Sequence, residues 1–283
     1  MPLKRGKMQF PTKLIIRGMG IRPVKSRGQN FLIDESLAEK TVKQADIMPD
    51  DCVVEIGPGP GALTFFIAQQ AVRVHCFEID RNLCAMLTEG FADSPVVVCN
   101  QDILKADFEG LCLPEGGMIL MGSIPYNITS KIVLKFFSTA RLFRNAVLIV
   151  QKEFAQRLCA SSGGRDYGIL SVFAQAYAPP NYLFSIPDKC FYPKPTVDSA
   201  AIMLVPDTSR DWTDAREVFF QKVVRAAFSM RRKKLKNCLK AFLGNDPAGA
   251  EEGLLAVGID LGRRAETLSL EEFYSLADFL RGL

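Results

Sequence analysis

The sequence has almost no histidine, since His75 is the only one among 283 residues. It lies in an apolar run, residues 72–77, that is typical of a buried strand, so we interpret it as a packing residue. A single histidine argues against a His-based catalytic triad and against the usual zinc ligand clusters. We therefore expect a reaction that needs neither a histidine base nor a metal, and methyl transfer from a sulfonium meets that condition.

The sequence also lacks paired cysteines and long apolar segments. Its eight cysteines form no CxxC pair and most have apolar neighbours, which is typical of reduced core thiols in a cytosolic protein. It contains no uninterrupted apolar stretch of about 18 residues, and its N-terminus has no apolar signal core. We expect a cytoplasmic protein that neither crosses a membrane nor is secreted.

Acidic residues are missing from two segments, although the net charge is only +4. Residues 1–33 contain eight Lys and Arg, residues 222–240 contain eight more, and neither segment contains Asp or Glu. One such segment alone would be interpreted as a solvated face. Two of them favour a polyanionic partner, and we expect that partner to be nucleic acid.

Short apolar runs alternate with helical periodicity over the first part of the chain. The runs predict strands at 52–56, 73–79, 96–99, 118–121 and 146–150. The periodic segments predict helices at 35–45, 62–70, 81–91, 127–137 and 152–160, the first of them capped by Asp34. This alternation predicts the α/β class, with a mainly parallel, Rossmann-like sheet covered on both faces.

The pattern changes after residue 179. Two runs, 182–186 and 199–205, predict an antiparallel pair at the edge of the sheet. Beyond 206–210 only helical periodicity remains, at 214–230, 233–242, 250–257 and 270–280, the last opened by a Ser269 and Glu272 capping box. We therefore predict a domain over 1–208, beginning with a mobile basic arm at 1–28, and a smaller all-α domain over 209–283.

A glycine-rich turn, EIGPGPG at 55–61, lies between a predicted strand and a predicted helix, where its backbone can pass close to a ligand. Glu78 ends the second strand, where a carboxylate can accept from both hydroxyls of a ribose, and Asp102 follows the third, where it can accept from an adenine amine. Each acid taken singly could instead cap a helix or lie on the surface. The turn alone fits both NAD and S-adenosylmethionine.

A second motif, SIPY at 123–126, follows the apolar run 118–121. The N6 amine of adenine is a poor nucleophile because its lone pair is delocalised into the ring. The side chain at position 123 and the carbonyl of Ile124 offer it two acceptors, Pro125 fixes the turn, and Tyr126 offers a ring face to the base. Alone, the motif also fits a strand-ending turn with a half-buried tyrosine. Its place after the glycine turn favours methylation of a base amine.

These motifs and several others occur in the order found in the rRNA adenine N6,N6-dimethyltransferases, and the chain resembles that family from about Lys25 to nearly its end. The motifs are KSRGQNFL at 25–32, EIGPGPGALT at 55–64, FEID at 77–80, QD at 101–102, SIPYNI at 123–128, FxPxPxVxS at 191–199, FSMRRKxLxN at 228–237 and RAExL at 264–268. The resemblance is greatest to the bacterial members that act on small-subunit rRNA. It implies S-adenosyl-L-methionine as cofactor and a Rossmann-like methyltransferase sheet. As substrate it implies two adjacent adenines in a hairpin loop near the 3′ end of 16S rRNA, within a small-subunit precursor.

The resemblance also implies roles for individual residues on the cofactor side. Asn30 and Leu32 would form a lid over the cofactor, and Gly57 would face its methionine part. Glu78 would bind the ribose and Asp102 the adenine.

On the target side, the resemblance implies that Ser123 touches both the cofactor and the target amine, beside the carbonyl of Ile124. Tyr126 and Phe191 would hold the flipped adenine between their rings. The basic residues expected to bind rRNA phosphates are Arg231, Arg232, Lys233 and Lys236. Ser123 departs from the family, which normally has Asn there. A hydroxyl reaches less far than an amide, so we expect slower turnover or a slower second methyl addition.

Three alternatives remain open from the sequence. A 23S rRNA adenine methyltransferase is disfavoured by the basic segment 231–233 and by the longer helical tail. A ribosome-assembly factor, or a relative of the mitochondrial transcription factors, would bind RNA with weak or lost catalysis. An NAD oxidoreductase is disfavoured by the single histidine and by the motif at 123–126. No coiled-coil pattern is present, so we expect a monomer.

Overall fold

The computed structural model describes residues 9–18, 20–21, 23–24, 28–111, 114–209, 214–230 and 232–283. They form two compact units. Unit 1 comprises the described residues up to Ala155 together with Pro180–Pro206, and unit 2 comprises Gln156–Pro179 together with the described residues from Asp207 to Leu283. The predicted domain boundary follows residue 208, whereas in the structure unit 2 contains residues 156–179 as well as the described residues from Asp207 onward.

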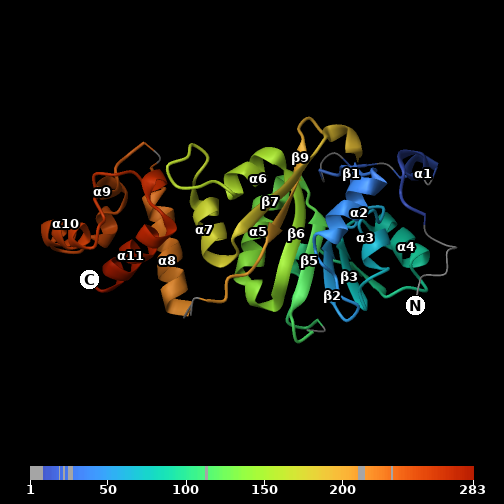
Figure 1. The fold of residues 1–283 in the computed structure, drawn as a ribbon, viewed down its shortest axis with the longest axis horizontal. Helices are drawn as coiled ribbons and strands as arrows, with labels where there is room; N and C mark the ends of the chain where they lie inside the picture. Colours follow the sequence, from blue (N-terminus) through green and yellow to red (C-terminus); the bar gives the residue numbers. More distant parts are fainter. Residues whose placement is uncertain are drawn as a thin grey trace. The chain divides into compact units, whose positions relative to one another are not determined.

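Unit 1 is built on a seven-stranded sheet (Figure 1). Its strands are β2 (Cys52–Ile56), β3 (Arg73–Glu78), β4 (Val96–Asn100), β5 (Met118–Ser123), β6 (Phe143–Gln151), β7 (Pro180–Ile186) and β9 (Ser199–Leu204). Their order is β4-β3-β2-β5-β6-β9-β7, in which the first five are parallel and the last two are antiparallel to their neighbours. The predicted parallel sheet and its antiparallel edge pair are confirmed.

The central strands are buried on both faces, which is why they read as continuous apolar runs. All five residues of β2 are buried, and so are five of the six residues of β5. Alternate residues point to opposite faces. Val74 belongs to the core cluster on one face, whereas the ring of Phe77 on the other face meets that of Phe108 with centroids 6.3 Å apart.

Six helices belong wholly or partly to unit 1. They are α1 (Lys13–Gly18), α2 (Glu35–Lys43), α3 (Thr64–Ile67), α4 (Arg81–Gly90), α5 (Thr129–Ser138) and α6 (Lys152–Leu158), the last of which runs across the division between the units. The Asp34 carboxylate accepts from the Leu37 N–H at 3.0 Å, so the predicted cap of α2 is confirmed. No helix of the described residues is long and apolar enough to span a membrane.

The basic N-terminal arm is partly folded, contrary to the expectation of a mobile segment. The short helix α1 buries Ile16 completely, in a cluster with Phe31 and Leu83. Phe10 is also buried, and its ring lies 6.1 Å from that of Phe65. These apolar side chains fix the segment, although its charged residues are basic and its pattern looks irregular.

A small second sheet joins distant parts of unit 1. Strand β1 (Phe31–Leu32) pairs antiparallel with β8 (Phe191–Tyr192), so that Phe31 lies opposite Tyr192 and Leu32 opposite Phe191. The pairing attaches the segment after the N-terminal arm to the proline-rich link between β7 and β9.

Unit 2 is helical, as predicted for the C-terminal part. Its helices are α7 (Ile169–Tyr177), α8 (Asp214–Ala227), α9 (Leu235–Cys238), α10 (Pro247–Ala256) and α11 (Leu270–Arg281), with α9 shorter than the predicted helix at 233–242. The sequence did not predict α7. It belongs to this unit because Phe173 packs on Phe220 of α8, which in turn packs on Tyr274 of α11, with ring centroids 6.4 and 5.1 Å apart.

Candidate active site

A cavity of about 280 Å³ lies in unit 1 at the edge of the sheet where β2, β3, β4 and β5 end. Its lining comes from residues 28–32, 55–60, 62–63, 77–79, 101–104 and 123–128. Parallel strands end at the same edge of a sheet, and this geometry gathers motifs that are far apart in the sequence. The cavity therefore contains both the predicted cofactor residues and the predicted SIPY turn.

The glycine-rich turn forms one wall of the cavity. Gly57 and Gly59 have φ of 59° and 58°, a backbone conformation that other residues adopt at a cost. A Cβ at Gly59 would lie 3.0 Å from Cδ1 of Phe31, which belongs to β1. Glycine here lets strand β1 pack directly against the turn.

Glu78 is buried at the end of β3, and both of its carboxylate oxygens are held by the backbone. Oε2 accepts from the Gly59 N–H at 3.2 Å, and Oε1 accepts from the Asp80 N–H at 2.9 Å. Burial raises the pKa of this carboxyl, while the backbone hydrogen bonds oppose the rise. Each carboxylate oxygen can accept a second hydrogen bond, so the group retains acceptors for ligand hydroxyls.

Asp102 lines the same cavity and also caps a short helical turn. Its Oδ1 accepts from the Leu104 N–H at 2.9 Å, at the start of the 3₁₀ turn Ile103–Lys105. Capping, which was an alternative for this residue, thus coexists with a position on the cavity wall.

Asn30 and Leu32, for which a lid role was predicted, both line the cavity. Asn30 donates through Nδ2 to the carbonyl of Gly28 at 3.3 Å, and Leu32 is buried in β1. They are held at the cavity by the pairing of β1 with β8.

The SIPY turn leaves the end of β5. A Cβ at Gly122 would meet the Ile56 carbonyl oxygen at 2.6 Å, so glycine allows β5 and β2 to approach closely just before the turn. The Ile124 N–H donates to the Ile149 carbonyl at 2.9 Å. Among the described residues, no donor is bonded to the carbonyl of Ile124, which leaves it able to accept from a ligand.

Tyr126 is anchored by two buried hydroxyl residues. Its phenolic oxygen lies 2.7 Å from Oγ of Ser199, a completely buried residue at the start of β9. Burial raises the pKa of Tyr126, and the bond to Ser199 opposes the rise. The hydroxyl of Thr129, which is also buried, donates to the carbonyls of Tyr126 and Pro125, at 3.3 and 3.1 Å. The ring is therefore neutral and held in place on the cavity wall.

Phe191 is not brought to the cavity, although it lies opposite Leu32 in the small sheet. Its side chain is 3% exposed and lies in the core cluster with Ala38 and Val42 of α2 and Ile186 of β7, and it does not line the cavity. The motif predicted an aromatic wall at this position, but the ring is buried in this core cluster. Tyr126 is the predicted stacking residue that the structure places at the cavity.

Sequence reasoning missed the role of Glu55, although it begins the glycine motif. Its carboxylate is buried in the cavity wall and accepts from the Thr64 hydroxyl at 2.7 Å and from the Cys76 thiol at 3.5 Å. Burial raises the pKa of Glu55 to about 7. The sequence signal that could have identified Glu55 as a site residue is its position just before the first glycine of the motif. The described residues contain no cluster of His, Cys, Asp and Glu that could hold a metal.

The basic segment of unit 2 is exposed. Arg232, Lys233 and Lys236 have exposed side chains, and Lys236 forms an ion pair with Glu251. Arg231, which was also predicted to bind RNA, lies outside the described residues. The N–H groups of Leu235 and Lys236 donate to the carbonyls of Arg263 and Leu261, at 2.9 and 3.0 Å.

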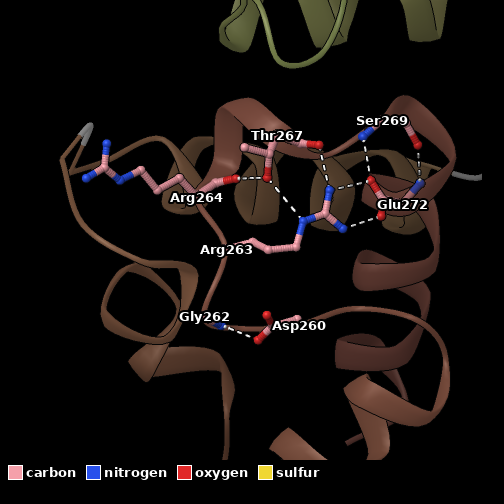
Figure 2. A network of polar contacts seen from close by, with 7 residues as sticks. All are labelled: Asp260, Gly262, Arg263, Arg264, Thr267, Ser269 and Glu272. Atoms are coloured by element: carbon pink, nitrogen blue, oxygen red, sulfur yellow. Dashed lines mark hydrogen bonds and ion pairs between the residues drawn. The ribbon is translucent and has the colours of Figure 1, made fainter.

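The loop that receives these bonds is fixed by a polar network (Figure 2). The Arg263 guanidinium donates to the Glu272 carboxylate and to the Thr267 carbonyl. Glu272 also accepts from the Ser269 N–H at 2.8 Å, which completes the predicted capping box. Arg264 points away from this network and is about half exposed. The network holds the loop 260–269 as a support for the basic segment.

Known proteins resemble this chain over most of its length. Residues 22–281 match the family described as ribosomal RNA adenine dimethylase. The ribosomal RNA small subunit methyltransferase A of Geobacter metallireducens is 41% identical over 272 residues, which cover 95% of this chain and 99% of the relative. That of Syntrophotalea carbinolica is 44% identical over 264 residues, or 93% and 98% of the two chains.

Two solved structures share the fold. The 23S rRNA methyltransferase ErmE matches with a TM-score of 0.70 and 25% identity, over 89% of this chain and 100% of its own. A dimethyladenosine transferase from Plasmodium falciparum matches with a TM-score of 0.74 and 24% identity, over 86% and 94%. Both similarities extend well beyond the sheet that surrounds the cavity.

Proposed function

The chain belongs to the ribosomal RNA adenine dimethylase family, and we propose that it dimethylates the N6 amines of two adjacent adenines in small-subunit rRNA. The substrate would be a hairpin loop near the 3′ end of 16S rRNA, within a precursor of the small ribosomal subunit. One observation carries this proposal: the same cavity is lined by both the acidic strand ends and the SIPY turn. A cofactor and a base amine can therefore meet in it.

The residues present fit S-adenosyl-L-methionine. The left-handed glycine turn leaves its backbone open to close approach, and Glu78 keeps free lone pairs beside it for ribose hydroxyls. Asp102 and the exposed Ile79 side chain line the part of the cavity where an adenine would fit, and Gly57 would face the methionine end. When bound, this cofactor supplies an electrophilic methyl group on a sulfonium.

The residues of the SIPY turn would position the nucleophile. The Ile124 carbonyl and the Ser123 hydroxyl can accept from the two N–H groups of an adenine amine. Positive charge grows on that nitrogen during the reaction, and fixed acceptors favour it without moving. Tyr126 offers a neutral, anchored ring for the flipped base to stack on. Positioning, and not proton transfer, would be the main contribution of this site.

We propose that the two units divide the work. Unit 1 would hold the cofactor and the target base, and unit 2 would bind rRNA through its exposed basic segment, with Arg232 and Lys233 contacting phosphates. Lys236 is already paired with Glu251, so its contribution would be smaller.

Mass spectrometry of rRNA tests this function. Cells that lack the gene should lose N6,N6-dimethyladenosine at two adjacent positions near the 3′ end of 16S rRNA, and purified protein with S-adenosylmethionine should restore it on their small subunits. Loss of a modified adenine in 23S rRNA instead would assign the alternative substrate. Unchanged rRNA in both subunits, with no methylation in vitro, would leave a binding role.

A further inference from the structure

We propose that Ser199 is a positioning residue for the methyl transfer, acting through the hydroxyl of Tyr126 to hold the ring on which the target adenine stacks. The inference rests on the function proposed above and adds a residue to its site. Ser199 ends the motif FxPxPxVxS, and the sequence assigned no role to this serine. It is not part of the cavity wall, so it would not touch the substrate.

The topology brings Ser199 to the site. Strand β9 runs antiparallel to β6 and begins where β6 ends, with Ser199 opposite Gln151. Because β6 is parallel to β5, this is the edge of the sheet from which the SIPY turn emerges. The Ser199 Oγ lies 2.7 Å from the hydroxyl of Tyr126, across 73 residues of sequence.

The environment of this hydrogen bond allows it to fix the orientation of the Tyr126 ring. Ser199 is completely buried and belongs to a strand paired on both sides, by β6 and by β7, so its hydroxyl cannot drift. Tyr126 lies in a short 3₁₀ turn and is only half-buried, so its ring has more freedom than the strand. The bond to the fixed strand therefore restrains the aromatic ring of Tyr126 at the cavity. A buried hydroxyl left without its partner is costly, so the pair also resists rearrangement.

The experiment measures single-turnover methylation of unmethylated small ribosomal subunits at increasing subunit concentration. Ser199→Ala should lower the maximal rate about tenfold, because the ring is no longer held in the productive orientation. The subunit concentration at half-maximal rate should change by less than about twofold, since docking depends on basic residues of unit 2. A lower fraction of folded enzyme would reduce the amplitude of the turnover and leave its rate constant unchanged.

A matched control exists in the same sheet. Tyr182 and Ser185 of β7 form a hydroxyl pair of the same length, 2.7 Å, on the exposed surface and away from the cavity. Ser185→Ala should therefore leave the rate unchanged. If it slows methylation as much as Ser199→Ala does, the effect is not specific to the Tyr126 ring and the inference fails.

The variant Tyr126→Phe covers the case in which Ser199→Ala folds poorly, and the two variants together form a double-mutant cycle. Tyr126→Phe removes the same hydrogen bond from the other side and should also slow the reaction, and adding Ser199→Ala to it should cause little further loss. If Ser199→Ala lowers the methylation rate by the same factor with and without the Tyr126 hydroxyl, Ser199 does not act through Tyr126. Full activity of Ser199→Ala would overturn this inference alone, whereas a wild-type protein that methylates no rRNA would overturn it together with the proposed function.

Discussion

At the scale of single residues, Ser123 offers the most direct change of rate. The unmethylated amine has two N–H groups to be accepted, and the monomethylated amine has only one, so its orientation depends on fewer contacts. A short hydroxyl holds either substrate less firmly than an amide would, and a misplacement of about 1 Å can cost on the order of a hundredfold in rate. Ser123→Asn should therefore speed methylation, most of all the second transfer, and Ser123→Ala should slow it.

Single-turnover assays that separate mono- from dimethyladenosine test both Ser123 variants. Both should keep the wild-type melting temperature to within a few degrees, because position 123 is half-buried in a strand-ending turn. If Ala at this position methylates as fast as Ser, the hydroxyl does not accept from the target amine.

The raised pKa of the Glu55 carboxyl should make the free energy of unfolding of the protein depend on pH. This carboxyl has a pKa near 4.5 in the unfolded chain and about 7 in the folded protein. Between these values the folded state keeps a proton that the unfolded chain has released, so stability should fall as the pH rises through this range. Glu55→Gln keeps an acceptor for Thr64 but cannot ionise. It should exceed the wild type in stability above pH 8 by about 3 kcal/mol.

Chemical unfolding of the cofactor-free protein measures this change in stability. It should be done at about pH 5 and about pH 8.5, because these two values bracket most of the range between the unfolded and folded pKa of Glu55. Glu89 is an exposed carboxylate on α4, and Glu89→Gln is the matched control, which should follow the wild-type profile. Parallel pH profiles for Glu55→Gln and the wild type would mean that Glu55 is no more basic in the folded protein than in the unfolded chain.

The sequence predicted these residues unevenly. Glu78 and Asp102 were readable because each lies at the end of an apolar run, and parallel strands bring such positions to one edge. Phe191 was misplaced, since its burial depends on long-range packing in the core cluster that no local pattern reveals. The bond between Tyr126 and Ser199 was equally invisible, because it depends on how an antiparallel strand begins beside β6.

At the scale of elements, the basic segment before and within α9 can be tested by its response to salt. Replacing Arg232 and Lys233 by Gln should weaken binding to small subunits and reduce the slope of log affinity against log salt by roughly one for each phosphate that is no longer neutralised. Lys236→Gln is the control, because Glu251 already compensates its charge, and it should have a smaller effect. Filter binding at several salt concentrations gives the slope. If the slope is unchanged in the double variant, the basic segment does not contact RNA phosphates and is only a solvated face.

Elements were predictable where a short apolar run is buried throughout or where a capping residue marks the start of a helix. The strands β2, β3 and β5 were found because they are mostly apolar and buried, and Asp34 and Ser269 marked their helices by capping. The helix α7 was missed because its sequence, ILSVFAQAY, is mostly apolar and most of its residues are buried, so it lacks the broad polar face of a surface helix. The short helix α1 was missed because its six residues are too few to show a helical period and only Ile16 among them is buried.

At the scale of the whole molecule, the division into two units predicts that damage to one core spares the ligand site of the other. Phe220 is buried in unit 2 between Phe173 and Tyr274. Phe220→Ala should destabilise that unit by about 3–5 kcal/mol. The affinity for S-adenosylmethionine should not change, because every residue that lines the cavity belongs to unit 1.

Hydrogen exchange of α8 and α11 measures the stability of unit 2, and calorimetry measures cofactor affinity. Phe219→Ala, at a neighbouring and less buried ring, should lose less stability and serves as the control. A fall in cofactor affinity that parallels the loss of protection would show that the two cores are coupled. The predicted boundary at 208 would have left Phe173 on the wrong side, since nothing in the sequence of 156–179 identifies the rings it meets.

The pairing of β1 with β8 has a consequence for how the protein is made. A chain emerges from the ribosome N-terminus first, so β1 must wait until Phe191 and Tyr192 have been synthesised before it gains its partner. The main sheet waits similarly, because β9 is made after β7 yet lies between it and β6. Both closures depend on residues 191–204, which are among the last to be made in unit 1. A nascent chain therefore cannot complete the part of the cavity wall that β1 forms until unit 1 is nearly complete.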